Sequence, residues 1–395
     1  MTKKRSYIVI GLGYGDEGKG LATDYLCANS KRQIVIRFNG GQQAGHTVVN
    51  NKGQRHIFSN FGSGTLRGIP TYWSRYCSFS PIYLLSEYRD LTVQPTLYLD
   101  KLCPVTTHYD VLYNRAIEST RGEYRYGSCG QGYGATIDRH SETSFKLLVS
   151  DLFQQNVLEK KLQQIKAYYQ EKTDKNTKYQ FNFFNHTKED KRFKRYIGKI
   201  EKLILNGVIR LVDERDIFQN NKLWETYIFE GAQGILLDED FGFRPYVTKS
   251  NTTSKNALEM LDRYFSDDDI ETEIFYVTRA YLTRHGGGPF FQDDFSIKLR
   301  GTRSESNRNN PNQGVFKRAP LNIQLLNYAL NCDASVSKRI KKNIVVTCLD
   351  QLPSERITII DNTKPTDISY MDLPNLLDCN FNRCKFSFSS CADAL

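Results

Sequence analysis

A glycine-rich segment near the start of the chain restricts its fold more than any other feature of the sequence. Residues 11–20 read GLGYGDEGKG, a composition that suits neither the interior of a strand nor that of a helix. A short β-branched run at 6–10 precedes this segment, a helical pattern follows at 21–27, and a second apolar run lies at 33–38. Strand, loop, helix and strand in this order predict a parallel α/β sheet with right-handed crossovers.

Later apolar runs extend this sheet. Residues 227–230, 274–278 and 344–347 are expected to form further buried strands. We therefore predict one α/β domain over residues 1–395, with a large, mostly parallel central sheet and helices on both faces. A highly charged helical stretch at 143–207 is expected to be an exposed helical insertion.

Composition narrows the class of protein without identifying its ligands. The 395 residues include 54 Lys and Arg against 44 Asp and Glu, a net charge of +10. This charge suits nucleic acid, small anionic substrates, or simply a solvated surface. No stretch approaches the ~18 apolar residues of a transmembrane helix, and the first residues resemble neither a secretory signal nor a transit peptide. Nine cysteines without a CxxC pair or zinc-ligand spacing are expected to be free thiols in a reducing, cytoplasmic compartment.

The glycine loop lies where an open α/β sheet binds anions, between the carboxyl end of a strand and the N-terminus of a helix. It matches the GxGxxG dinucleotide pattern, but the next strand ends in Arg37, Phe38 and Asn39, without the carboxylate that would hold a ribose. It also matches the first part of a Walker A loop, with Gly20 in place of the hydroxyl residue for Mg²⁺. Asp16 can supply a metal ligand or a base instead. The alternative interpretation is a surface turn.

A histidine follows a second glycine-rich turn. His46 stands in the segment AGHT, shortly after Gly40 and Gly41 and after the predicted strand at 33–38. Doubly wound sheets present catalytic side chains at this kind of position. We therefore expect His46 to act as an acid or a base.

Five blocks in a fixed order resemble the adenylosuccinate synthetase family. The resemblance implies a two-step ligase, in which a nucleoside triphosphate phosphorylates the 6-oxygen of a purine nucleoside monophosphate and L-aspartate displaces that phosphate. It also implies a homodimer, and we expect neither nucleic acid nor a membrane as a partner. The blocks are GDEGKG at 15–20, AGHT at 44–47, FEGAQGILLD at 229–238, PYVTKSNTT at 245–253 and TRHGGGPF at 283–290.

The resemblance implies roles for individual residues. Asp16 would take the N1 proton of the purine and bind Mg²⁺, the expected cofactor, with the Gly45 carbonyl as a further ligand. His46 would donate to the transferring phosphoryl group, Gln233 would hold the purine and its 6-oxygen, and Lys19 would face phosphate. The other residues expected to bind nucleotide are Gly15, Glu17, Gly18, Gly20, Gln43, Ser128, Cys129, Thr248 and Asp350.

The chain departs from the family pattern around both nucleotides. Cys129 stands where the family has the second threonine of a phosphate-binding pair. For the arginine that reaches across the family dimer, Arg139 is the nearest candidate. In the motif that reads the donor base, Cys348 replaces a lysine while Asp350 is retained, so ATP or dATP is an alternative to GTP.

The expected aspartate-binding loop is also altered. Residues 300–320 are polar and rich in asparagine, which predicts a mobile loop. Of the arginine-rich pattern of the family, only Lys317 and Arg318 are expected to bind the carboxylates of L-aspartate.

The acceptor nucleotide stays open between two choices. A viral branch of the family uses dGMP and usually has Ser at the position of Asp16, so the retained Asp16 favours IMP, with GTP as the donor. Residues 61–72 and the changed donor site resemble the viral members instead, which favours GMP or dGMP with ATP or dATP and N6-succino-2-amino-(deoxy)adenylate as the product. A catalytically silent nucleotide-binding protein is a further alternative, against which the presence of Asp16, Lys19, His46 and Gln233 counts.

Overall fold

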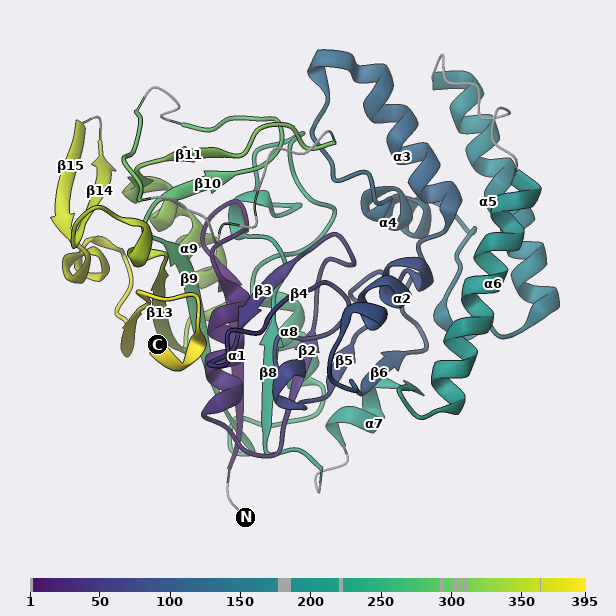
Figure 1. Cartoon of the computed structure of the whole chain (residues 1–395), viewed down its shortest axis with the longest axis horizontal. Coiled ribbons are helices and arrows are strands. Elements are labelled where there is room, and N and C mark those ends of the chain that lie inside the picture. The colour runs from purple at the N-terminus through teal and green to yellow at the C-terminus, as the bar shows by residue number, and fades with distance from the viewer. Residues whose placement is uncertain are drawn as a thin grey trace.

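A nine-stranded parallel sheet forms the centre of the computed structural model (Figure 1). Every ladder within it is parallel, and all five strands predicted from apolar runs belong to it. In order across the sheet the strands are β16 (Arg383–Phe386), β13 (Lys341–Thr347), β9 (Ile270–Arg279), β1 (Lys4–Gly11), β8 (Thr226–Glu230), β2 (Gln33–Arg37), β5 (Thr71–Trp73), β6 (Leu97–Asp100) and β7 (Ile209–Val212).

The structure describes residues 3–176, 186–219, 223–291, 295–300, 305, 307, 312–362 and 364–395. All nine cysteines lie within these ranges and are free thiols. Over the same ranges, no helix combines the length and the apolar character needed to cross a membrane. The α-helices are α1 (Lys19–Ala28), α2 (Pro81–Asp90), α3 (His108–Arg121), α4 (Tyr133–Glu142), α5 (Gln155–Asn176), α6 (His186–Leu205), α7 (Glu214–Phe218), α8 (Lys255–Asp262) and α9 (Ile323–Ser337).

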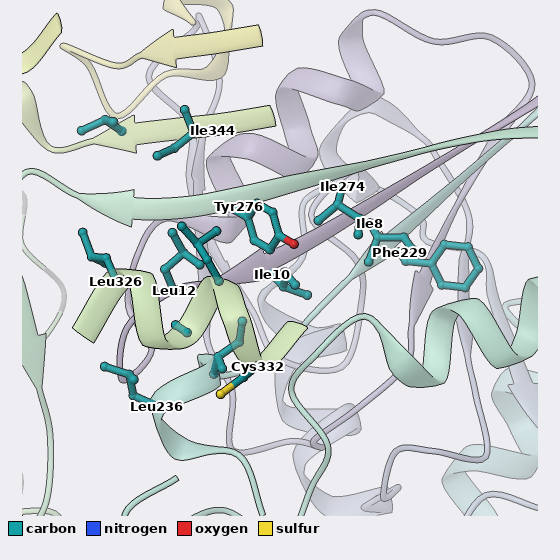
Figure 2. Packing of buried hydrophobic residues seen from close by; sticks show 14 of the residues in the cluster. Ile8, Ile10, Leu12, Phe229, Leu236, Ile274, Tyr276, Leu326, Cys332 and Ile344 are labelled. Carbon is teal, nitrogen blue, oxygen red and sulfur yellow. The ribbon is translucent and has the colours of Figure 1, made fainter. Parts of the chain in front are cut away.

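The two faces of the sheet pack into different apolar clusters, because successive side chains of a strand point to opposite sides. In β1, Ile8 and Ile10 enter one cluster, whereas Tyr7 and Val9 enter another. The first cluster contains buried side chains of α8 and α9, as Figure 2 shows for α9, and the second contains those of α1. Helices therefore cover both faces, which confirms the predicted fold class.

A second large core lies beside β5, β6 and β7, where α2 to α6 gather (Figure 1). The segment predicted as a charged insertion, 143–207, contributes α5 and α6. These helices bury one apolar stripe each, including Leu158 and Phe193, while charged side chains such as Lys160 and Lys191 are exposed. The spacing of the apolar residues explains this amphipathic arrangement. That the segment is an insertion stays a prediction.

Three small sheets accompany the central one, and two of them carry predicted site residues. His46 begins β3, and Lys317 and Arg318 lie in β11. The small sheets pair β3 (His46–Val49) with β4 (Arg55–Phe58), β10 (Leu282–Arg284) with β11 (Lys317–Ala319), and β12 (Leu321–Asn322) with β14 (Arg356–Asp361) and β15 (Lys364–Ser369).

Candidate functional site

A cavity of about 710 Å³ lies at the carboxyl ends of the central strands. The loops that follow β1, β2, β8, β9 and β13 all contribute to it, as expected for an open parallel sheet. Most of the predicted site residues line this cavity, whereas Glu17, Lys317 and Arg318 do not. The predicted residues in the lining are Gly15, Asp16, Gly18, Lys19, Gly20, Gln43, Gly45, His46, Ser128, Cys129, Gln233, Thr248 and Asp350.

Glu17 stabilises the conformation of the glycine loop by hydrogen bonds to its backbone. Its Oε1 accepts hydrogen bonds from the backbone N–H groups of Gly13, at 3.0 Å, and Gly15, at 2.8 Å. Its Oε2 accepts from Lys19 Nζ at 2.5 Å, and both side chains are almost fully buried. The structure thus places Glu17 in a supporting position, and Lys19 is the member of this pair that lines the cavity.

Close packing explains why the loop lacks the Walker hydroxyl. A Cβ atom added at Gly20 would lie 3.0 Å from the Cβ of His46 and 3.1 Å from Ser63 Oγ. Such contacts are shorter than ordinary van der Waals contacts, so a neighbouring atom would have to shift by a few tenths of an ångström. The absence of a side chain at position 20 therefore favours the close approach of α1 to the His46 strand.

Asp16 projects from a backbone conformation that is unusual for a non-glycine residue. Its φ is +67°, in the left-handed region. The Asp16 carbonyl accepts a hydrogen bond from Arg279 Nε at 2.5 Å, and its Oδ2 lies 3.6 Å from His285 Nε2. Burial raises the pKa of Asp16, against the opposing effect of the Arg279 and His285 charges. A carboxylate with a raised pKa is suited to accept a proton near neutral pH.

Arg279 is a residue that the sequence alone did not identify as functional. Its guanidinium is almost fully buried and bonds Tyr281 OH at 2.8 Å and Glu305 Oε2 at 2.6 Å, in addition to Asp16. Both Arg279 and Glu305 line the cavity. Position 279 ends β9 opposite Thr347 of β13, so only its place at the carboxyl end of a strand could have indicated a function.

His46 forms a buried pair with Glu230. The imidazole Nδ1 lies 2.6 Å from Glu230 Oε1, and Glu230 also accepts hydrogen bonds from the backbone N–H (3.0 Å) and the hydroxyl of Ser63. Since a carboxylate only accepts, Nδ1 carries a proton in this contact and Nε2 is the nitrogen left for chemistry.

The charges around this pair set its protonation. Burial lowers the pKa of His46, with Glu230 opposing, so the ring is predominantly neutral. Burial alone would raise the pKa of Glu230, but His46, the Arg37 guanidinium and Ser63 together lower it to about 2. Glu230 directly follows Phe229 in one of the family-like blocks, yet nothing local indicated its contact with His46.

Two glutamine side chains bring unpaired polar groups to the cavity. Gln43 Nε2 and Oε1 and Gln233 Oε1 are buried and have no hydrogen-bond partner among the residues that the structure describes. Gln233 also has a positive φ, of +61°. Because buried polar groups are normally paired, these atoms indicate a ligand with polar edges.

The loop with Ser128 and Cys129 lies on another wall. Ser128 Oγ is within hydrogen-bond distance of the Asn114 amide, at 3.1 Å from Nδ2. Burial raises the pKa of Cys129 to about 11, so its thiol stays protonated. Thr248 lines the same cavity next to Lys249, whose Nζ pairs with Asp138 at 3.0 Å.

The predicted donor-base motif forms the wall that follows β13. Thr347 Oγ1 donates to the Glu17 carbonyl at 2.6 Å, which ties this strand to the glycine loop. Cys348 has a φ of +61°, and burial raises its pKa, so it presents a neutral thiol. Asp350 lines the cavity together with Ser389 and Ser390 of the C-terminal segment.

Lys317 and Arg318 are not among the residues that line the cavity. They belong to β11, where Arg318 is paired with Thr283 of β10. The Lys317 ammonium lies 5.8 Å from the ring centre of Phe290, and the Arg318 guanidinium lies over Phe316. Residues 301–304, 306 and 308–311 of the predicted aspartate-binding loop lie outside the described residues.

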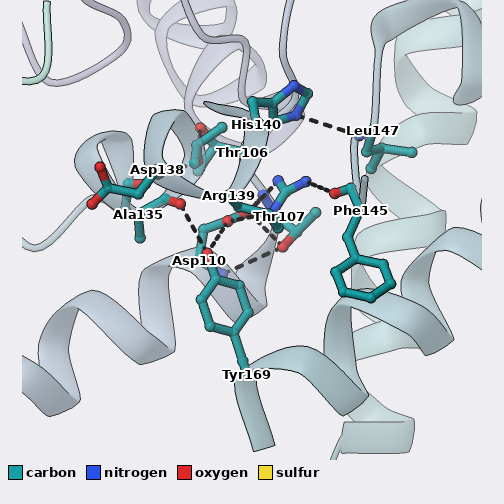
Figure 3. Close-up of polar contacts among 12 residues, drawn as sticks. Thr106, Thr107, Asp110, Ala135, Asp138, Arg139, His140, Phe145, Leu147 and Tyr169 are labelled. Carbon is teal, nitrogen blue, oxygen red and sulfur yellow. Dashed lines mark hydrogen bonds and ion pairs between the residues drawn. The ribbon is translucent and has the colours of Figure 1, made fainter. Parts of the chain in front are cut away.

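Arg139 is wrong as a candidate for an arm that reaches a second subunit. Its side chain is fully buried and donates to both carboxylate oxygens of Asp110 at 2.9 Å (Figure 3). It also donates to the carbonyls of Phe145, at 2.6 Å, and Val105, at 3.0 Å, while Tyr169 OH donates to Asp110. Each nitrogen of the guanidinium is thus hydrogen-bonded to partners in its own chain. Its pair with Asp110 joins α4 to α3, and no sequence pattern indicated this contact.

Known proteins resemble this chain in sequence. A family model described as adenylosuccinate synthetase matches residues 8–360. The adenylosuccinate synthetase of Proteus mirabilis is 32% identical over 297 residues, which cover 72% of this chain and 63% of that protein. That of Neisseria meningitidis is 32% identical over 306 residues, with 73% and 65% covered. The matched part thus spans less than two thirds of the length of these relatives.

Two solved structures share the fold. A fully ligated adenylosuccinate synthetase from Plasmodium falciparum superposes with a TM-score of 0.76 at 18% identity and covers 99% of both chains. The succinoaminodeoxyadenylate synthetase of cyanophage S-2L, bound to dGMP and to dATP as an energy donor, gives a TM-score of 0.66 at 16% identity. It covers 99% of this chain and 95% of its own.

Proposed function

Because the chain belongs to the adenylosuccinate synthetase family, we propose that it is a ligase that joins L-aspartate to C6 of a 6-oxopurine nucleoside monophosphate. The observation that carries this proposal is the convergence of Asp16, Lys19, His46 and Gln233 on one cavity from three separate segments of the chain. A base, a phosphoryl-directed donor, an amide and a cation are the groups that this chemistry needs.

In the first step, Asp16 accepts the proton from N1 of the purine, and the electron density shifts to the 6-oxygen. That oxygen attacks the γ-phosphorus of the donor, the bond to the β-phosphate oxygen breaks, and a nucleoside diphosphate leaves. His46 donates from Nε2 to the transferring phosphoryl group when its ring is protonated at both nitrogens, and the Glu230 carboxylate at Nδ1 stabilises this positively charged form. In the second step, the amine of L-aspartate attacks C6 and the 6-phosphate departs.

Gln233 and Gln43 are suited to orient the purine. Their unpaired amide atoms can accept from and donate to the edge of a base. Holding the base in one register places its 6-oxygen near both His46 and the donor phosphate, which lowers the entropic part of the barrier.

The donor set fits magnesium. Asp16 and the Gly45 carbonyl, both in the cavity lining, are hard oxygen ligands, and Mg²⁺ typically takes one or two protein ligands and completes its shell with phosphate and water. The described residues contain no group of three or more His, Cys, Asp or Glu side chains able to hold a metal alone, which agrees with such a shared shell. When bound, Mg²⁺ would neutralise charge on the donor phosphates.

IMP is our first choice of acceptor, with GTP as donor, because Asp16 is retained. The second candidate, GMP or dGMP with ATP or dATP, is favoured by the neutral Cys348 thiol at the predicted donor-base wall. This wall lacks the lysine expected beside Asp350. A binding-only role is a third candidate.

Phosphate release tests these choices. The purified protein is assayed with IMP or dGMP, with GTP or ATP, and with or without L-aspartate. We expect release only with all three substrates and Mg²⁺, and with IMP above dGMP. Release with dGMP alone would refute IMP as the acceptor, and no release with any combination would refute the ligase.

Asp16→Ala and His46→Ala should each reduce turnover by at least about 100-fold, the usual contribution of acid–base groups. Asp268→Ala, which removes an exposed carboxylate just before β9, is the matched control and should leave turnover unchanged. Full activity in either site variant would contradict the role assigned to that residue. The homodimer implied by the family is tested separately by light scattering.

A further inference from the structure

Glu17 and Glu118 bind loop amides in the same way. Glu17 lies between the amides of the glycine loop and the Lys19 ammonium, as described above. Glu118 of α3 repeats the arrangement: its Oε2 accepts from the N–H groups of Gly127, at 2.9 Å, and Ser128, at 3.3 Å. Its Oε1 accepts from Arg121 Nη1 at 2.5 Å. In both cases a carboxylate bridges two backbone donors and one cation.

The two arrangements differ in their access to solutes. The side chains of Lys19 and Glu17 are 3% and 4% exposed, and Glu17 does not line the cavity. Arg121 and Glu118 are 33% and 12% exposed, and both line the main cavity beside Ser128. Glu118 and Ser128 also border a second cavity of about 400 Å³. A solute can therefore reach the Glu118 contact but not the Glu17 contact.

The groups around Glu118 form an oxyanion cradle, which we define as the Gly127 and Ser128 amides and the Arg121 guanidinium. Consecutive backbone N–H groups and a guanidinium are the donors that commonly bind phosphate. Arg121 is held in place by stacking over the Tyr126 ring, at 3.6 Å from the ring centre. A phosphate monoester offers three oxygens and up to two charges, so it satisfies these donors better than one carboxylate does.

We propose that the Glu118 carboxylate is an internal competitor in this cradle, and that the phosphate of the acceptor nucleoside monophosphate displaces it. The inference rests on the proposed function, in which Ser128 belongs to the monophosphate site. Arg121 of the same chain then supplies the positive charge that Arg139, buried against Asp110, cannot supply. Glu118 thereby sets the affinity for the acceptor and favours dianionic phosphate over weaker anions.

Titration calorimetry with inorganic phosphate, IMP, dGMP, GTP and ATP tests the proposal on the full chain. Glu118→Gln removes the competing charge, and we expect the Kd for IMP or dGMP, and for phosphate, to fall by about tenfold. Arg121→Gln should raise the same Kd values by about tenfold. Glu123→Gln, which removes an exposed carboxylate from the same segment, is the matched control and should change neither. The Kd for GTP and ATP should stay constant in all variants.

The other outcomes overturn the proposal. Unchanged or weaker monophosphate binding in Glu118→Gln would show that Glu118 only stabilises the conformation of the loop. Failure of both Glu118→Gln and Glu118→Ala to fold would lead to the same conclusion. A change confined to GTP or ATP would assign the cradle to the donor. The proposed function is judged separately by turnover of the unmodified protein, and inorganic phosphate probes the cradle even if that turnover is absent.

Discussion

Replacing Glu230 by Gln should separate catalysis from binding. Glu230 is fully buried, contacts His46 Nδ1 at 2.6 Å, and does not line the cavity. The change Glu230→Gln keeps the shape of the side chain and one carbonyl acceptor for Ser63. It removes the negative charge that fixes the His46 tautomer and stabilises the ring when it acquires positive charge.

The structure sets the size of the effect. A hydrogen bond to a charged group contributes about 1.5–3 kcal/mol, and each ~1.4 kcal/mol of lost transition-state stabilisation lowers a rate tenfold. Loss of the charged His46–Glu230 contact should therefore lower kcat by roughly 10- to 100-fold. The KM for each substrate should stay within about twofold, because Glu230 touches none of them.

Steady-state kinetics on folded protein decides the matter, with Glu87→Gln as the matched control. Glu87 is likewise buried, accepts from the backbone N–H groups of Ser59 (3.1 Å) and Asn60 (2.6 Å), and lies 3.7 Å from a histidine, His56. It does not line the cavity, so Glu87→Gln should lose stability but keep kcat. A Glu230→Gln variant with wild-type kcat, or with a raised KM and unchanged kcat, would refute the positioning role.

Three further outcomes are expected. Asp110→Asn should lower the free energy of unfolding by about 3–5 kcal/mol, because it leaves the Arg139 guanidinium buried without its charge partner; urea titration measures this, and a loss below about 1 kcal/mol would contradict it. Gly20→Ser should reduce kcat, because the added side chain would displace His46. An unaltered kcat would show that neighbouring atoms accommodate the serine without moving His46. The folded-state pKa of Glu230, about 2, lies below its ordinary 4.5, so its ionised form contributes stability that is complete above pH 4.5 and declines as the pH falls toward 2. Urea midpoints at pH 6 and pH 3 should therefore differ less in Glu230→Gln than in the unmodified protein, and an equal difference would contradict this.

The centre of the fold could be predicted because its strands are apolar on both faces. Runs such as 6–10 and 274–278 are continuous and β-branched, which is typical of buried parallel strands. The strands toward the edges of the sheet were not predicted, because they are short and lack a continuous apolar run. β5 has three residues and β7 has four, and both become strands through their neighbours rather than through their own pattern.

The candidate site could be predicted where glycine accompanies a functional group. Asp16, His46 and Gln233 all stand within or beside glycine-rich turns, and all three line the cavity. Arg279 and Glu230 could not be found in this way. Arg279 is 263 positions from Asp16, and Glu230 is 184 from His46, so only the order of the strands brings each pair together.

Backbone conformation is the further property of the site that residue types do not show. Of the five non-glycine residues with positive φ among those described, Asp16, Gln233 and Cys348 line the cavity. Each follows the carboxyl end of a central strand, and a left-handed non-glycine residue costs roughly 1–2 kcal/mol. At Asp16, the bond from Arg279 and the amide contacts of Glu17 offset this cost. The loop therefore presents its carboxylate through contacts with β9, so a substitution at Arg279 should disturb Asp16 even though the GDEGKG motif stays intact.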